Sequence, residues 1–154
     1  MAFPYKKVLC PVNFDENSLT AINEAAALAI HSAGILMLLH VVHISPLAAQ
    51  GAAEGFAGSQ LYDDQLKAAH DQVAQMATHL PAGLKPEIVV EIGDPAEVIL
   101  ASVLQRQADV VVMATHGRTG LARIVMGSVT DRIVRGSHAP VLTVLPVASA
   151  PAAQ

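Results

Sequence analysis

Small residues at fixed spacing near the C-terminus form the part of this sequence that is best suited to chemistry. Ala114 and Gly117 follow an apolar run, and after nine further residues Gly127 and Ser128 precede an amphipathic segment. This order predicts a strand, a loop whose main-chain amides surround an anion, and the first turn of a helix. Because a helix N-terminus favours negative charge, the pattern indicates a bound phosphate group.

Arginines are concentrated in the same part of the chain. Four of the five arginines lie between positions 118 and 135, where Asp131 is the only acidic residue, so this segment carries a charge of +3 (four minus one). The whole chain has a formal net charge of -4. A local positive field on an acidic protein favours a small anionic ligand, because a nucleic-acid partner needs a broad basic face.

Length and composition predict a single α/β domain. The chain has 154 residues, of which 53% are hydrophobic and only 3% aromatic, so aliphatic side chains must build the core, as they do where helices cover a parallel sheet. No apolar run reaches the roughly 18 residues of a membrane span, and the first residues do not resemble a signal peptide. We therefore expect a cytoplasmic protein with no membrane partner.

The remaining segments have simpler expected roles. We expect one domain over residues 1–146, with a loose loop at 45–59, followed by a mobile tail at 147–154 that is rich in Ala, Ser and Pro. The single cysteine, Cys10, lies inside the first apolar run, which predicts a buried and unreactive thiol.

Short apolar runs alternate with longer helical patterns along the chain. Strands without polar alternation, each joined to the next by a helix, predict right-handed crossovers and one open, doubly wound parallel sheet with helices on both faces. Ligands of such sheets bind at the carboxyl ends of the strands. The predicted strands are 8–12, 35–42, 88–92, 110–114 and 141–145. The predicted helices are 16–33, 60–79, 95–107 and a fourth that starts at the Gly127-Ser128 pair and that Gly136 can stop.

Local signals predict where two of the helices begin and end. Asp15 is placed to cap the start of the first helix, and Gly34 is placed to end it. Ser128 and Asp131 have the spacing of a capping box, so we expect the fourth helix to begin at the pair of Gly127 and Ser128.

Four further stretches are informative when they are taken together with the glycine loop. They are Tyr5-Lys6-Lys7-Val8-Leu9-Cys10-Pro11-Val12, Leu39-His40-Val41, Gly93-Asp94-Pro95 and Pro140-Val141-Leu142-Thr143-Val144. With them the chain resembles the universal stress protein family over roughly residues 5 to 146. The resemblance implies a Rossmann-like fold with strand order 3-2-1-4-5 and a homodimer formed through the strand from Val141 to Leu145.

The resemblance also implies a nucleotide site, because nucleotide-binding members carry the motif Gly-x-x-Gly-x9-Gly-(Ser/Thr). Pro11, Val12 and Asn13 would then line the base and ribose, and Val41 would offer main-chain groups to the adenine edge. The expected ligand is ATP with Mg²⁺. The expected phosphate-side residues are Met113, Ala114, Gly117, Arg118, Gly127, Ser128, Val129 and Thr130.

Two positions depart from that motif. Ala114 stands where the motif has its first glycine, and its methyl group narrows the close approach that glycine allows. Asn13 stands where ATP-binding members carry an acidic residue, so it keeps hydrogen-bonding capacity but loses the charge. These departures leave a second hypothesis open, a nucleotide-independent interaction protein of the same fold.

The motifs favour a regulatory binding protein over an enzyme. The glycine loop lacks the Gly-Lys-Ser/Thr of P-loop hydrolases, and the seven histidines form no recognisable ligand set for a resident metal. Pro11-Val12-Asn13-Phe14 stands where a dinucleotide-dependent oxidoreductase would carry Gly-x-Gly-x-x-Gly. A phosphorelay receiver would need acidic residues at the ends of the first and fourth strands, where Asn13 and Ala114 stand.

Overall fold

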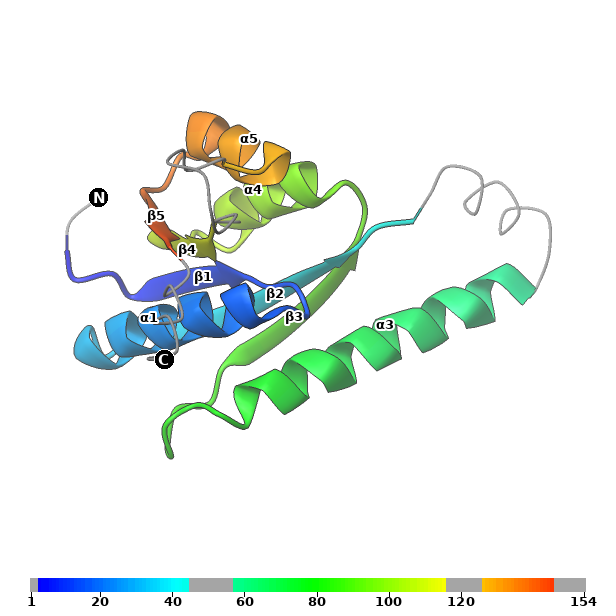
Figure 1. Ribbon diagram of the computed structural model, residues 1–154, viewed down its shortest axis with the longest axis horizontal. Helices are drawn as coiled ribbons and strands as arrows, with labels where there is room; N and C mark the ends of the chain where they lie inside the picture. The colour runs from blue at the N-terminus through cyan, green and yellow to red at the C-terminus, as the bar shows by residue number, and fades with distance from the viewer. Residues whose placement is uncertain (1–2, 45–56, 116–125, 146–154) are drawn as a thin grey trace, which may run out of the picture.

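One five-stranded parallel sheet lies at the centre of the computed structural model, which describes residues 3–44, 57–115 and 126–145 (Figure 1). The strand order is β3-β2-β1-β4-β5, as the family resemblance implied. The chain therefore runs from the centre to one edge and then from the centre to the other, and the winding reverses between β1 and β4. The strands are β1 (Lys7–Pro11), β2 (Ile35–Val42), β3 (Glu87–Ile92), β4 (Val110–Ala114) and β5 (Val141–Val144).

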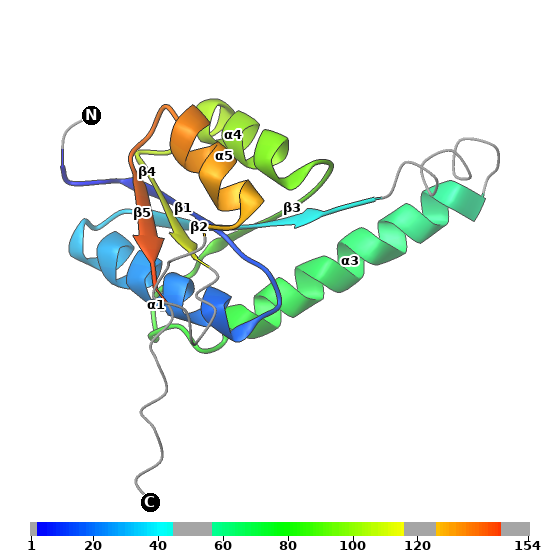
Figure 2. The ribbon, with the colours of Figure 1, turned by 45° about the horizontal axis from the view of Figure 1, so that its top comes forward.

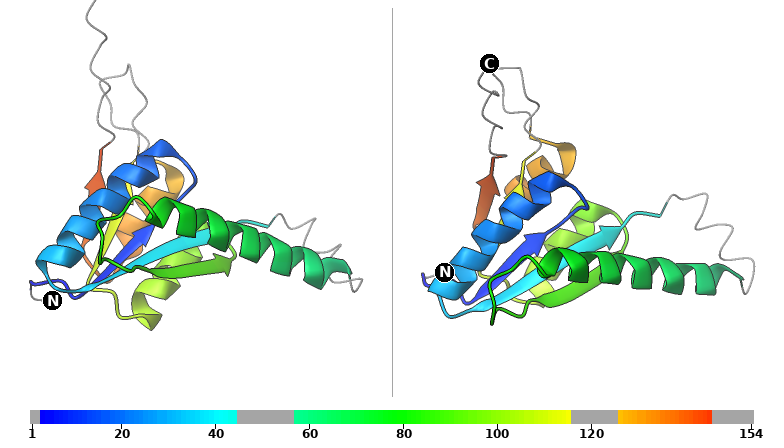
Figure 3. Two further views of the ribbon diagram at one scale, coloured as in Figure 1. Left: turned by 90° about the horizontal axis from the view of Figure 1, so that it is seen from below. Right: turned by 60° about the horizontal axis from the view of Figure 1, so that its bottom comes forward.

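Helices cover both faces of this sheet (Figure 2). One face carries α1 (Glu16–His31) and α3 (Ala57–Ala77), and the other carries α4 (Pro95–Gln105) and α5 (Ser128–Gly136). The C-terminal half of α3 packs against the sheet through the buried Ala69 and Val73, whereas its N-terminal half extends past the end of the strands (Figure 3). None of the helices in the described parts of the chain is both long enough and apolar enough to cross a membrane.

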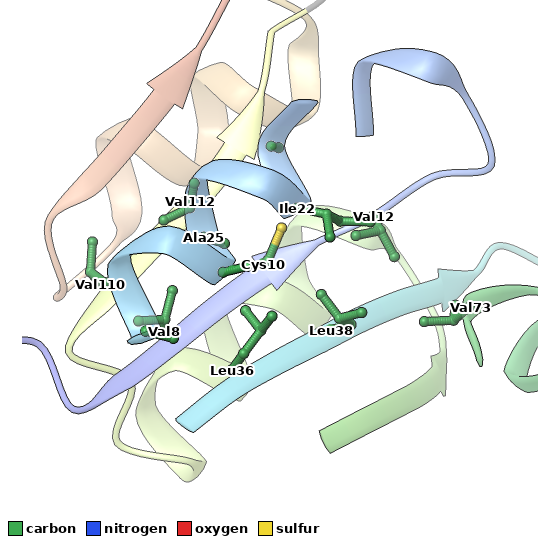
Figure 4. Packing of buried hydrophobic residues seen from close by; sticks show 13 residues of the cluster. Val8, Cys10, Val12, Ile22, Ala25, Leu36, Leu38, Val73, Val110 and Val112 are labelled. Carbon is green, nitrogen blue, oxygen red and sulfur yellow. The ribbon is translucent and has the colours of Figure 1, made fainter. Parts of the chain in front are cut away.

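Burial of both faces explains why the strands read as continuous apolar runs. On β1, Val8 and Cys10 belong to the cluster beneath α1, which Figure 4 shows, and Leu9 belongs to the cluster beneath α4 and α5. The Cys10 thiol is fully buried, and this burial raises its pKa to about 12. The predicted burial of this cysteine is therefore confirmed.

α1 ends at His31 with Ser32 as its C-cap, and the left-handed residue that terminates the helix is Ala33 rather than the predicted Gly34. Ala33 takes the left-handed conformation with a φ of 46°. The amides of Ala33 and Gly34 donate to the carbonyls of Ile30 (3.1 Å) and Ala29 (2.8 Å), which is the double hydrogen bond of a Schellman motif. Glycine is needed at position 34 for another reason, because a Cβ there would lie 2.6 Å from the carbonyl oxygen of Lys6.

Most other boundaries lie within a few residues of the predictions. α4 ends at Gln105 rather than at 107 because Gln107 takes a left-handed φ of 54°. α3 begins at Ala57, inside the segment that the sequence predicts as a loop. The rest of that segment, 45–56, and the predicted tail, 147–154, lie outside the described residues.

Candidate functional site

A pocket of about 220 Å³ lies between the carboxyl ends of β1 and β4, where the winding of the sheet reverses. Ligands of open α/β sheets bind at this position. Every predicted binding residue that the structure describes lines the pocket, whereas Gly117 and Arg118 lie outside the described residues. The lining residues that the sequence predicted are Pro11, Val12, Asn13, Val41, Met113, Ala114, Gly127, Ser128, Val129 and Thr130.

Five lining residues were absent from the predicted set: Asp15, Ser18, Leu39, Pro95 and Ile99. Leu39 shares the face of β2 with Val41, so strand alternation is a signal that could have found it. Pro95 and Ile99 are four residues apart on the first turns of α4, and only the packing of α4 against the sheet brings them to the pocket.

The N-terminus of α5 offers main-chain donors to this pocket. Its N-cap is Gly127, whose carbonyl accepts a hydrogen bond of 3.0 Å from the Asp131 amide. No described residue accepts a hydrogen bond from the amides of Ser128, Val129 or Thr130. Free amides at a helix start are well suited to bind an anion.

The predicted capping box of Ser128 and Asp131 is wrong. No side chain caps α5, because the N-cap position is taken by Gly127 and Ser128 is already the first helical residue. The Asp131 carboxylate instead accepts hydrogen bonds of 2.9 Å from Nε of Arg135, one turn further along the helix. The Ser128 hydroxyl is therefore not used as a cap.

The turn after β1 is held by hydrogen bonds of its own. Oδ1 of Asp15 accepts a hydrogen bond from the Ser18 amide at 2.9 Å, so Asp15 caps α1 as predicted. The main-chain amide of Asn13 donates to Oγ of Ser18 at 2.8 Å. The Asn13 main-chain donor is thus engaged inside the turn, whereas its side-chain amide is available to a ligand.

An ion pair joins the start of α4 to the middle of α5 beside the pocket. Nη1 of Arg132 lies 2.9 Å from Oδ1 of Asp94, and Nη2 lies 3.7 Å from Glu97. Asp94 is also the N-cap of α4, since Oδ1 accepts the Glu97 amide at 3.0 Å. This main-chain hydrogen bond, followed by the charge of Arg132, lowers the pKa of Asp94 below its usual value.

The expected positive field requires a correction. Both described arginines of the segment 118–135 are paired with acids, Arg132 with Asp94 and Arg135 with Asp131, and neither lines the pocket. Arg118 and Arg123 lie outside the described residues. Among the lining residues that the structure describes, only Asp15 has an ionisable side chain, and it serves as a helix cap. The described part of the pocket therefore presents main-chain amides, hydroxyls, the Asn13 side-chain amide and apolar walls rather than positive charge.

The described histidines show no arrangement typical of a metal centre. Within residues 3–44, 57–115 and 126–145, no group of three or more His, Cys, Asp or Glu side chains is placed to hold a metal ion. His40 and His43 bind different main-chain oxygens, those of Val12 at 2.8 Å and of Gly93 at 3.4 Å.

Comparison with known proteins gives a consistent family assignment. The model of the universal stress protein family matches residues 4–144. Universal stress protein MJ0531 of Methanocaldococcus jannaschii is 34% identical over 143 residues, which cover 91% of this chain and 82% of that relative. MJ0577 of the same organism is 28% identical over 157 residues, which cover 94% of this chain and 97% of that relative.

Solved structures show the same fold. The structure of MJ0577 superimposes with a TM-score of 0.76 over 94% of this chain and 99% of that one, at 28% identity. A universal stress protein solved in complex with cAMP gives a TM-score of 0.59 over 91% of this chain and 96% of that one. Its identity to this chain is 22%, so this likeness establishes the shared fold alone.

Proposed function

This chain belongs to the universal stress protein family, and from that premise we propose that it is a regulatory protein that binds an adenine nucleotide, ATP with Mg²⁺. One observation carries the proposal: the pocket at the reversal point of the sheet is lined both by the strand ends and by the first amides of α5, from which no described residue accepts a hydrogen bond. The apolar part suits a base, and the amides suit phosphate groups.

The lining residues divide into two parts that match the two ends of a nucleotide. Pro11, Val12 and Val41 would enclose the base, and the Asn13 side-chain amide is available to ribose hydroxyls. The amides of α5 would hold the phosphates, whose charge the helix dipole favours. Mg²⁺ would supply counter-charge to the phosphates when the nucleotide is bound.

We propose a regulatory role without strong catalysis, because the one ionisable lining side chain of the described pocket, Asp15, is engaged as a cap. Nucleotide occupancy would then alter conformation or the choice of protein partner. The proposed location is the cytoplasm. A universal stress protein of the same fold has been solved in complex with cAMP, so that protein holds an adenine nucleotide on this fold.

We also propose that the chain forms a homodimer through β5 and Leu145. β5 lies at the edge of the sheet, with β4 as its neighbour. Leu142 and Leu145 are 46% and 52% exposed there. Proteins tend to cover apolar sheet edges, and a second copy of the same strand is one way to do so.

Mass spectrometry of small molecules released from the denatured, purified protein tests the nucleotide directly. Thermal unfolding with added ATP and Mg²⁺ then measures binding, since a ligand at one hundred times its dissociation constant stabilises a fold by about 2.7 kcal/mol. Binding of ATP in both assays would support the proposal, and no shift at millimolar ATP would contradict it.

Two variants of Ser128 separate the contribution of its main-chain amide to ATP binding from that of its hydroxyl. Ser128→Pro removes the Ser128 amide, and proline fits the first helical position because Gly127 before it is already extended, with a ψ of 157°. Ser128→Ala removes only the hydroxyl. We expect Ser128→Pro to weaken ATP binding more than Ser128→Ala does, while both variants fold.

The second candidate is a nucleotide-independent interaction protein. The observation in its favour is that the main-chain amide of Asn13 and the carboxylate of Asp15 are both engaged within the turn after β1. This candidate predicts no thermal shift with ATP and no effect of Ser128→Pro on the binding of protein partners.

A further inference from the structure

His40 lies near the carboxyl end of β2 and contacts the turn after β1 without being one of the residues that line the pocket. Its neighbours Leu39 and Val41 line the pocket, and alternation along a strand sends His40 to the other face. Nδ1 of His40 lies 2.8 Å from the carbonyl oxygen of Val12. A carbonyl only accepts hydrogen bonds, so Nδ1 carries the proton and donates.

The His40 ring also packs against Phe14. The two ring centroids are 4.2 Å apart, with an angle of 31° between the planes. His40 therefore holds the turn at two points, the carbonyl of Val12 and the side chain of Phe14, on either side of the pocket residue Asn13.

The contact with Val12 replaces one of the hydrogen bonds between the parallel strands β1 and β2. β1 and β2 are paired from Lys7 with Ile35 to Pro11 with Leu39, and the Val12 amide still donates to the Leu39 carbonyl at 2.8 Å. If the ladder continued, the Val41 amide would donate to the Val12 carbonyl next. Among the described residues, the partner of that carbonyl is the His40 ring instead.

We propose that His40 is a positioning residue that takes the Val12 carbonyl and thereby leaves the main-chain edge of Val41 open for the base of a bound nucleotide. This inference rests on the proposed function. An open strand edge presents both an N–H donor and a C=O acceptor. Adenine offers the matching acceptor and amino donor on its Watson–Crick edge, so the arrangement selects adenine over bases with the reversed pattern.

Two variants distinguish the donor from the bulk of the ring. His40→Leu keeps a side chain of similar size but removes the donor. His40→Asn places an amide nitrogen at the same number of bonds from Cβ as Nδ1, so it can still donate to Val12, although it lacks the ring that packs on Phe14. Rescue by His40→Asn would show that the hydrogen bond, rather than the packing of the ring, sets the position of the turn.

The first measurement is amide hydrogen exchange by NMR on the protein without nucleotide. We expect the Val41 amide to exchange rapidly in the unmodified protein and in His40→Asn, and to become protected in His40→Leu, where the Val12 carbonyl is free to accept it. A Val41 amide that is already protected in the unmodified protein would overturn the proposal.

The second measurement compares ATP, GTP and inorganic tripolyphosphate by titration calorimetry. We expect His40→Leu to weaken ATP binding about tenfold, to leave tripolyphosphate binding unchanged and to reduce the preference for ATP over GTP. Equal loss for ATP and tripolyphosphate would mean that the whole pocket is disturbed, and unchanged ATP affinity would mean that the contact is irrelevant to the base. Either result overturns the proposal.

Failure of the proposed function would give a different result in these two measurements. If the unmodified protein binds neither ATP nor tripolyphosphate, the nucleotide is wrong for this chain, and the exchange rate of the Val41 amide still decides whether His40 keeps the strand edge open.

Discussion

Asp109 and Lys7 bind each other through two hydrogen bonds at the amino end of the sheet. The Lys7 amide donates to Oδ2 of Asp109 at 2.8 Å, and the Asp109 amide donates to the Lys7 carbonyl at 2.8 Å. The Lys6 amide donates to the same carboxylate oxygen at 2.8 Å. One carboxylate thus aligns the starts of β1 and β4, the two strands whose other ends form the pocket.

Removal of this carboxylate should destabilise the protein. We expect Asp109→Ala to lower the free energy of unfolding by about 1–3 kcal/mol, because two main-chain amides lose a charged acceptor. Asp109→Asn keeps an oxygen acceptor and should cost less. Urea denaturation measures both variants, and a loss below about 0.5 kcal/mol for Asp109→Ala would contradict the expectation.

The end of α1 allows a paired prediction at adjacent positions. Ala33→Gly relieves a left-handed alanine and should stabilise the fold by about 0.5–1 kcal/mol. Gly34→Ala should destabilise it by about 1–3 kcal/mol, because the new Cβ meets the main chain of Lys6 at 2.6 Å, which no side-chain rotation relieves. Thermal unfolding of the two variants gives the signs, and the same sign for both would refute this account of the turn.

The buried thiol of Cys10 should be unreactive in the native protein. Its pKa is raised from 9.0 to about 12, so almost no thiolate is present at pH 8, and burial excludes the reagent as well. We expect no reaction with a thiol reagent at pH 8 until denaturant is added, followed by modification of one thiol per chain. Rapid labelling under native conditions would contradict the position of Cys10 in the core.

The same pKa shift links stability to alkaline pH. Because the pKa of Cys10 is raised in the native protein, its contribution to the free energy of unfolding is complete below pH 9.0. That contribution is lost as the pH rises toward 12, since between these values only the unfolded chain releases the thiol proton. Cys10→Ala should therefore lose less stability than the unmodified protein between these pH values. Parallel pH dependence of the two proteins would argue against the shift.

Asp94 gives the opposite pH dependence. Its pKa is lowered from 3.8, chiefly by the hydrogen bond from the Glu97 amide and also by Arg132. Its contribution to the free energy of unfolding is therefore present above pH 3.8 and is lost as the pH falls through the lowered pKa. We expect the melting temperature of the unmodified protein to fall more steeply below pH 4 than that of Asp94→Asn. Arg132→Gln should show a smaller change, because the helix cap remains.

Restoring glycine at position 114 tests the departure from the family motif. Ala114 lines the pocket, and without its methyl group a ligand can approach the main chain more closely. We expect Ala114→Gly to tighten ATP binding roughly threefold, or about 0.7 kcal/mol, and to reduce stability by roughly 0.5–1 kcal/mol. The buried Ala139, which is not among the lining residues, supplies a control, since Ala139→Gly should leave affinity unchanged. Weaker binding by Ala114→Gly would show that the methyl group contributes to the site.

Local patterns predicted the elements well because each depends on a short segment of chain. The largely apolar runs at 35–42 and 110–114 became strands whose central residues are buried on both faces, and Asp15 became the cap of α1. The strand order and the lining residues came from the family resemblance, since periodicity alone does not say which strands are neighbours. Gly117 and Arg118 lie outside the described residues, and the binding roles of these and of all the other site residues stay predictions.

The predictions that failed concern residues whose type suits more than one structural role. Asp131 was expected to complete a cap with Ser128, but it pairs with Arg135 on the same helix. Gly34 was expected to end α1, but the left-handed residue is Ala33, and glycine is needed at position 34 because the main chain of Lys6 lies against it. In each case a competing contact decided the outcome, and sequence spacing alone does not rank such contacts.

By itself, the sequence determined the alternation of strands and helices, the buried cysteine and, through its motifs, the family to which the chain belongs. Only the tertiary structure decided that Asp109 aligns Lys7 from 102 positions away, that His40 takes the carbonyl of Val12, and that the ends of β1 and β4 share a pocket with α5. The physical reason is that backbone conformation and burial follow from nearby residues, whereas hydrogen bonds across the fold depend on distances that exist only after the whole chain has packed.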